Sequence, residues 1–386
     1  MFFHLPPVGE PVVSSGCKAD LSGFDALIAP YQRYFYASGT AALAAAVLAA
    51  CRRRADITQP EVLLPAYACP DLLSAVLYAG ARPVLVDLAP GRPWLDLDRL
   101  GETLSGNTVA VIAVNFLGIE ERHDAIRRLV GAVDALLIED SAQSFPAKPD
   151  SHDWQGDLVV LSFGRGKPVS LLGGGALLYR KSLGGFIERP PQQQRSTGEA
   201  VKFRLTALVY NQFIQPQWYW LPESLPFLRL GETVFHPLEA IAGISATRLA
   251  CLQDSVHSYQ TRSRGIREIL AAVLAPLHEQ GLLIDLVRGC DLDADRPLLR
   301  YPLLLPPESR DKALFALARA GLGVSRFYPG ALPSLSGVDK IAEIQGDFPQ
   351  AELFARRLLT LPSHNRVTVR HVEAMRSIID NIIITC

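Results

Sequence analysis

The chain has 386 residues and a formal net charge of −1 at pH 7, from 38 basic and 39 acidic side chains. This length allows a large core and two domains. A balanced charge provides no overall field that would recruit nucleic acid or an anionic membrane, so any phosphate must be held locally.

Six cysteines are scattered without a CxxC pair: Cys17, Cys51, Cys69, Cys251, Cys290 and Cys386. This spacing argues against a metal site of the zinc type and against a disulfide framework. Residues 1–7 lack the basic region and long apolar stretch of a signal peptide. The most apolar run, residues 41–51, is roughly half of a membrane span. We therefore expect a cytoplasmic protein.

Short apolar runs alternate with helical patterns over residues 34–185. Strands are predicted at 62–64, 83–87, 109–114, 135–138, 158–162 and 175–179, with helices at 40–53, 70–79 and 122–130. This alternation predicts an α/β fold with a largely parallel sheet covered by helices on both faces. Ligands of such sheets bind at the carboxyl ends of the strands.

Residues 186–236 interrupt this alternation. Residues 192–198 predict a mobile loop, and the aromatic-rich stretch 210–230 includes Trp218 and Trp220. Three prolines in this stretch exclude one continuous amphipathic helix. We expect it to pack on a partner subunit or over the active site, and membrane association is the less favoured alternative.

A helical pattern over residues 237–274, with Pro276 as its stop, predicts the exit from a large domain. Further on, 298–304 predicts a strand, and 309–320 and 369–379 predict helices. We therefore expect a large domain over residues 1–245 and a smaller α/β domain over 246–386.

Lys167 is the most informative residue of the chain. It follows the strand predicted at 158–162, and Asp140 follows the strand before it. Pyridoxal phosphate (PLP) chemistry needs a lysine that forms an imine with the cofactor aldehyde. It also needs a carboxylate that keeps the pyridine nitrogen protonated. Taken singly, Lys167 can also be interpreted as a solvated loop lysine and Asp140 as a helix N-cap.

A possible anion site precedes the helix predicted at 40–53. Ser38 and Gly39 come just before Thr40, and a helix start leaves backbone N–H groups free to face a phosphate. A plain N-cap by Ser38 or Thr40 is the alternative.

Several motifs occur in a fixed order along the chain. They are Ser38–Leu43, Leu64–Cys69, Pro83–Asp87, Val114–Gly118, Glu139–Gln143 and Ser162–Lys167, followed by Arg326–Pro329, Phe348–Glu352 and Leu361–His364. This series resembles the DegT/StrS-type aminotransferases, the mostly sugar-modifying branch of the fold type I PLP enzymes. The resemblance covers most of the chain and weakens over 186–236. It implies a seven-stranded-type, largely parallel sheet and a smaller C-terminal α/β domain.

The resemblance also implies roles for residues around the cofactor ring. Lys167 would be the Schiff-base lysine and the base that moves the proton between the substrate carbon and the cofactor carbon. Asp140 would pair with the pyridinium nitrogen, and Gln143 would hydrogen-bond the phenolic oxygen. Relatives with histidine at the position of Lys167 are dehydratases, so lysine favours transamination.

The phosphate would be held at the helix start and at the following strand end. Gly39, Thr40 and the amide of Ala41 form the predicted helix start, and Ser162 contributes its hydroxyl. The glycine run after Lys167 is one residue shorter than is usual in the family and lacks its frequent acidic residue.

Two further departures concern the surroundings of the cofactor. The ring that usually stacks on the cofactor is replaced by Cys69. Tyr67 is expected either to supply a ring instead or to pack in the core. The asparagine that the family lends from the partner subunit is missing from residues 232–237. Asn211 is a candidate replacement, with a plain turn or surface role as the alternative.

The expected activity is transfer of an amino group from an amino acid, with glutamate as the expected donor. The acceptor would be a keto-sugar, a nucleotide sugar or a cyclitol. A PLP-dependent elimination on a sugar and a non-catalytic, regulatory PLP-binding protein are the alternatives. The resemblance implies a homodimer, and no nucleic-acid partner is expected.

Overall fold

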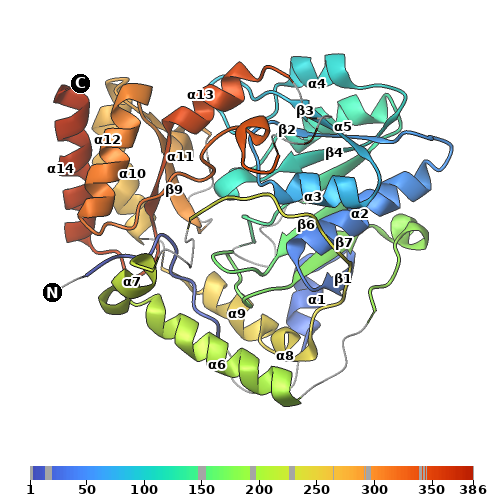
Figure 1. Cartoon of the computed structure of the whole chain (residues 1–386), viewed down its shortest axis with the longest axis horizontal. Helices are drawn as coiled ribbons and strands as arrows, with labels where there is room; N and C mark the ends of the chain where they lie inside the picture. The colour runs from blue at the N-terminus through green and yellow to red at the C-terminus, as the bar shows by residue number, and fades with distance from the viewer. Residues whose placement is uncertain are drawn as a thin grey trace.

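A computed structural model describes most of the chain. The described residues are 3–13, 20–146, 154–191, 197–225, 231–263, 265–290, 292, 297–338, 341, 344 and 346–385. Figure 1 shows two α/β units: a large sheet with its helices, and a smaller unit formed mainly by the C-terminal part of the chain. No helix of the described residues is long and apolar enough to cross a membrane.

Helices and strands alternate over the first half of the chain. In order they are α1 (Ser22–Ile28), β1 (Gln32–Tyr36), α2 (Gly39–Arg53), β2 (Glu61–Pro65), α3 (Asp71–Tyr78), β3 (Arg82–Val86), α4 (Leu97–Thr103), β4 (Thr108–Val114), η1 (Phe116–Gly118), α5 (His123–Gly131), β5 (Leu136–Asp140), β6 (Leu158–Ser162), β7 (Gly175–Tyr179) and η2 (Lys181–Phe186). The six predicted strands and three predicted helices are confirmed, whereas β1, α1 and α4 were not predicted.

Seven strands form one sheet in the order β1-β7-β6-β5-β4-β2-β3. Strands β2 to β6 pair in parallel, and β7 runs antiparallel between β6 and β1. Every residue of β2, β4 and β5 is buried. Helices α2 and α3 cover one face of the sheet, and α4 and α5 cover the other. The predicted, largely parallel α/β sheet is thus confirmed.

Two helices occupy the region that interrupts the alternation, α6 (Thr197–Phe213) and α7 (Pro216–Glu223). The prediction of a mobile loop was wrong for Thr197 and Gly198, which open α6; residues 192–196 lie outside the described residues. Pro216 is the first residue of α7, a position where a helix tolerates proline. The aromatic-rich stretch is thus divided between two helices, as its prolines predicted. Residues 226–230 of the aromatic stretch also lie outside the described part.

The prediction of one long helix over 237–274 was wrong. The structure has α8 (Ala246–Leu249), α9 (Leu252–Gln260) and α10 (Gly265–Glu279), and 237–245 is irregular. The backbone there bonds to other segments, because Ala37 N–H donates to Ala242 O and Gly243 N–H to Pro191 O. Pro276 lies inside α10 rather than after it. Buried Leu274 and Leu277 hold the last turn against the smaller core.

The smaller unit is built on a three-stranded antiparallel sheet in the order β10-β9-β8. Its elements are β8 (Ile284–Asp285), α11 (Leu286–Gly289), β9 (Arg300–Leu304), α12 (Pro307–Arg319), η4 (Leu332–Ser334), α13 (Pro349–Arg357), β10 (Leu358–Pro362) and α14 (Val369–Thr385). These confirm the strand predicted at 298–304 and the helices predicted at 309–320 and 369–379. The domain division at residue 245 stays a prediction: α9 packs in the core around β6 and β7, whereas α10 packs on the smaller sheet.

Candidate active site

A pocket with an empty volume of about 520 Å³ lies at the carboxyl ends of β4, β5 and β6. Its lining residues come from α2, α3, the three strand ends and the segment before η4. They are Gly39, Thr40, Leu43, Cys69, Asp71, Leu72, Val114, Phe116, Asp140, Ala142, Gln143, Val160, Ser162, Lys167 and Tyr328. The strand ends of a parallel sheet thus bring together seven of the sequence-predicted site residues.

Asp140 and Lys167 line the same pocket from neighbouring strand ends. Asp140 is the last residue of β5 and pairs in register with Val160 of β6, and the loop after β6 carries Lys167. Asp140 is buried, and its Oδ1 accepts the Ala142 N–H at 2.9 Å. Burial raises the pKa of the Asp140 carboxyl, whereas the Ala142 N–H and the Lys167 ammonium act in the opposite direction. The pocket therefore holds an amine and a buried carboxylate that interact electrostatically.

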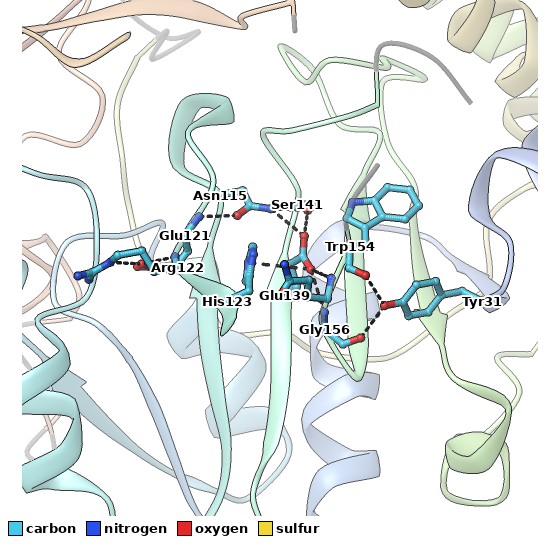
Figure 2. Close-up of polar contacts among 10 residues, drawn as sticks. Tyr31, Asn115, Glu121, Arg122, His123, Glu139, Ser141, Trp154 and Gly156 are labelled. Atoms are coloured by element: carbon cyan, nitrogen blue, oxygen red, sulfur yellow. Dashed lines mark hydrogen bonds and ion pairs between the residues drawn. The ribbon is translucent and has the colours of Figure 1, made fainter. Parts of the chain in front are cut away.

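Beneath the pocket, buried Glu139 fixes the end of β5 (Figure 2). Its Oε1 accepts hydrogen bonds from Asn115 Nδ2 at 2.9 Å and Ser141 Oγ at 3.1 Å. Its Oε2 accepts two backbone N–H groups of residues 155–156, at 2.8 and 3.0 Å. Successive residues of a strand point to opposite faces. Fixing Glu139 on one face therefore directs Asp140 toward the other face, where the pocket lies.

The amide of Gln143 is oriented by two contacts. Its Oε1 accepts the Leu117 N–H at 2.9 Å, and its Nε2 donates to the Tyr328 hydroxyl at 3.1 Å. Sequence reasoning assigned no role to Tyr328, although the motif Arg326–Pro329 contains it. The aromatic motif was a signal in the sequence, but only the structure shows that its Tyr328 lines the pocket at the strand ends of the large sheet.

The start of α2 approaches the end of β6 closely. A Cβ on Gly39 would lie 2.7 Å from Ser162 Cβ, and a Cβ on Gly175 would lie 2.8 Å from Gly39 N, so both positions require glycine. Ser38 caps the helix, since its Oγ accepts the Ala41 N–H at 3.0 Å. The expectation that the Ala41 amide holds a phosphate is therefore not supported. The first two amides of the helix, those of Gly39 and Thr40, have no carbonyl one turn earlier to bond.

A second pocket carboxylate, Asp71, was not predicted as a site residue. It is the first residue of α3, and its Oδ2 accepts the Thr40 hydroxyl at 3.1 Å. The sequence did contain a signal, because Asp71 lies two residues after Cys69, at the start of the helix that follows the motif Leu64–Cys69.

Tyr67 does not line the pocket. It is 3% exposed, and its ring packs against Phe116, Tyr328 and Phe354 with centroid distances of 5.6, 5.6 and 5.1 Å. Its hydroxyl donates to the carbonyls of Phe327 and Tyr328. The prediction that Tyr67 supplies a ring to a cofactor is therefore not supported, and its alternative, core packing, describes this side chain. Cys69 does line the pocket.

Asn211 lies on α6, and the structure does not bring it to the pocket. Its Oδ1 accepts the Val12 N–H and its Nδ2 donates to Val12 O, both at 2.9 Å. The predicted role of Asn211 in cofactor binding is therefore not supported, because both polar atoms of its amide anchor the N-terminal segment of its own chain.

Comparisons with known proteins agree with this architecture. A family model described as the DegT/DnrJ/EryC1/StrS aminotransferase family matches residues 25–183. The chain is 31% identical over 121 residues to the UDP-2-acetamido-2-deoxy-3-oxo-D-glucuronate aminotransferase of Pseudomonas aeruginosa, covering 31% of this chain and 34% of that protein. It is 29% identical over 87 residues to the GDP-4-keto-6-deoxy-D-mannose 3-dehydratase of Escherichia coli O55:H7, covering 22% of each chain. The matches thus span about a third or less of these relatives.

Among solved structures, NtdA of Bacillus subtilis with its cofactor PMP bound has a similar fold. The TM-score is 0.65 at 18% identity, over 91% of this chain and 73% of that chain. The matched residues 25–183 contain α2, β2 to β7 and nearly all of the pocket. Residues 25–183 of the chain are thus similar to the DegT/DnrJ/EryC1/StrS aminotransferase family.

Proposed function

We propose that the chain is a PLP-dependent aminotransferase that moves an amino group from an amino acid, with glutamate as the expected donor. The acceptor is a keto-sugar, a nucleotide sugar or a cyclitol, and the enzyme is cytoplasmic. The observation that carries the proposal is the meeting of Lys167 and Asp140 in one pocket at adjacent strand ends. The aminotransferase of Pseudomonas aeruginosa and the PMP-bound NtdA structure support it.

The residues of the pocket fit PLP. The glycine at position 39 leaves a space that a Cβ would fill against Ser162. The amides of Gly39 and Thr40 and the Ser162 hydroxyl would hold the phosphate there. Asp140 would hold the ring nitrogen.

When bound, PLP supplies an aldehyde that condenses with amines and a pyridinium ring that withdraws electrons. The chain supplies the groups that act around it. Lys167 Nζ would supply the amine and would take and return the proton of the substrate carbon. The Asp140 carboxylate would keep a proton on the ring nitrogen, because a negative charge stabilises the protonated form. The rings of Phe116 and Tyr328 contribute apolar surface to the lining of the pocket.

Lysine at position 167 favours transamination over the dehydration catalysed by some relatives. One matched relative is a 3-dehydratase, so the family includes both reactions. A lysine can both bond the cofactor and carry the proton, which is what moving an amino group requires. A regulatory protein that merely binds the cofactor would not need a buried carboxylate against the ring nitrogen.

We further propose a homodimer in which α6 contacts the partner. Phe203 on the inner side of this helix is buried, whereas Val201, Leu205, Leu208 and Val209 are 53–67% exposed. Contiguous apolar surface of this kind is costly to leave in water and is typical of interfaces. In Figure 1, α6 runs along the outer edge of the molecule.

The proposal is tested by the colour of the protein. PLP-loaded protein is expected to be yellow, and Lys167→Ala is expected to lose the visible band because no other amine of the pocket can bond the aldehyde. Lys181→Ala, which changes an exposed lysine of η2, is the matched control and keeps the band. A band that persists in Lys167→Ala, with the cofactor removed from free solution by gel filtration, contradicts the assignment of Lys167.

A further inference from the structure

Tyr328 enters the pocket in an unusual backbone conformation. Its φ is +69°, in the left-handed region that bulky residues rarely adopt, and it is only 7% exposed. The rings of Tyr67, Phe116 and Phe327 surround it, with centroids 4.9–6.0 Å away. Strained conformations persist where the surroundings enforce them, and they concentrate at functional sites.

The hydroxyl of Tyr328 accepts a hydrogen bond from a pocket residue, Gln143. Because Gln143 Oε1 is committed to the Leu117 N–H, Gln143 Nε2 is the atom that faces Tyr328, and it donates there at 3.1 Å. A primary amide nitrogen carries two hydrogens, so one N–H remains for the pocket.

Cys69 lines the same pocket as Tyr328. Burial raises the pKa of the Tyr328 phenol, so the hydroxyl keeps its proton. Burial also raises the pKa of the Cys69 thiol, to about 12, so the thiol stays neutral. The hydroxyl that accepts the Gln143 N–H is therefore a neutral group beside a neutral thiol.

Position 69 carries a thiol where the resembled family usually has a ring. Tyr328, from the segment before η4, contributes a ring to the lining of the same pocket.

We infer that Tyr328 is a positioning residue, which together with the Leu117 N–H holds the Gln143 amide so that an N–H donor, not a carbonyl acceptor, faces the phenolic oxygen of the cofactor. The inference rests on the proposed function, since it needs PLP in the pocket. The donor stabilises the negative charge of that oxygen. Without it, the oxygen holds a neighbouring proton more tightly.

The test is the pH titration of the visible absorbance of PLP-loaded protein. In Tyr328→Phe we expect the pH midpoint to rise by about half to one pH unit, the scale of one hydrogen bond to a charged oxygen. The Kd for PLP should also weaken by about threefold to tenfold. Cys69→Ala, which removes the neighbouring thiol and keeps the phenol, should raise the midpoint by less.

Tyr67→Phe is the matched control. It also removes a hydroxyl from the aromatic cluster, but one that bonds the backbone carbonyls of Phe327 and Tyr328 and not the Gln143 amide. We expect it to lower the melting temperature at least as much as Tyr328→Phe while leaving the pH midpoint unchanged. A purely structural role for Tyr328 would give both variants the same midpoint as the wild type.

The possible outcomes distinguish a failure of the proposed function from a failure of the role inferred for Tyr328. A wild-type protein without a visible band contradicts the proposed function itself. A wild-type band with an unchanged midpoint in folded Tyr328→Phe overturns only the role of Tyr328. An equal midpoint shift in Tyr67→Phe overturns it as well.

Discussion

Asp71 places a negative charge next to the groups that would receive a phosphate. Its carboxylate accepts the Thr40 hydroxyl and lines the same pocket as Ser162. A phosphate dianion there meets a like charge, and Thr40 is less available as a donor. The residues of the anion site therefore do not all favour tight binding.

We expect Asp71→Asn to bind PLP about tenfold more tightly than the wild type, because the repulsion is removed while the shape is kept. The measurement is a fluorescence titration of the apo-protein with PLP and, in parallel, with pyridoxal, which lacks the phosphate. Pyridoxal affinity should not change. Equal tightening for both compounds would place Asp71 elsewhere than beside the phosphate.

Whether the position of a side chain could be predicted from the sequence depended on which contacts fix that position. Lys167, Asp140 and Ser162 could be placed from sequence because strand ends of a parallel sheet meet at one edge. The directions in which the Tyr67 and Asn211 side chains point could not be predicted, because each is set by a partner distant in the sequence. Tyr67 bonds the backbone near residue 328, and Asn211 bonds Val12. Tertiary contacts of this kind leave no local pattern.

At the scale of elements, residues 237–245 show how a helical pattern can mislead. Their apolar spacing resembles a helix, yet their backbone bonds segments at Ala37 and Pro191. Tertiary hydrogen bonds outweighed a weak local propensity. Strands β2, β4, β5 and β7 were predictable because fully buried strands read as short, continuous apolar runs between turns.

The exposed apolar stripe of α6, formed by Val201, Leu205, Leu208 and Val209, leads to a prediction about the oligomeric state. We expect the combined change Leu205→Glu and Leu208→Glu to convert a dimer to a monomer, because it buries two charges in an apolar interface. Sedimentation or light scattering at micromolar concentration measures this. Thr206→Glu, also exposed on α6 but off the stripe, is the control and should leave the mass unchanged. A monomeric wild-type protein, or equal dissociation by the control, would exclude this interface.

At the scale of the whole molecule, the N-terminal segment ties the two units together. Leu5 is buried in the core of the smaller sheet, and Val12 is buried in the core near β6 and β7. His364 Nε2 lies 2.8 Å from Pro6 O. Sequence patterns predicted both units but not this connection, because the segment has no periodic structure of its own.

The arrangement of the two units determines the composition of the pocket. The large sheet contributes the strand ends and helix starts, and the segment before η4 contributes Tyr328 to the lining. The smaller unit is therefore expected to influence the chemistry of a cofactor held mainly by the large one.

The most direct test of the aminotransferase assignment is the absorbance spectrum of PLP-loaded protein on adding glutamate. We expect the visible band to convert to that of the pyridoxamine form, with stoichiometric release of 2-oxoglutarate, and Lys167→Ala to show neither change. A loaded wild-type protein whose band stays unchanged with glutamate and with every other common amino acid would contradict the assignment.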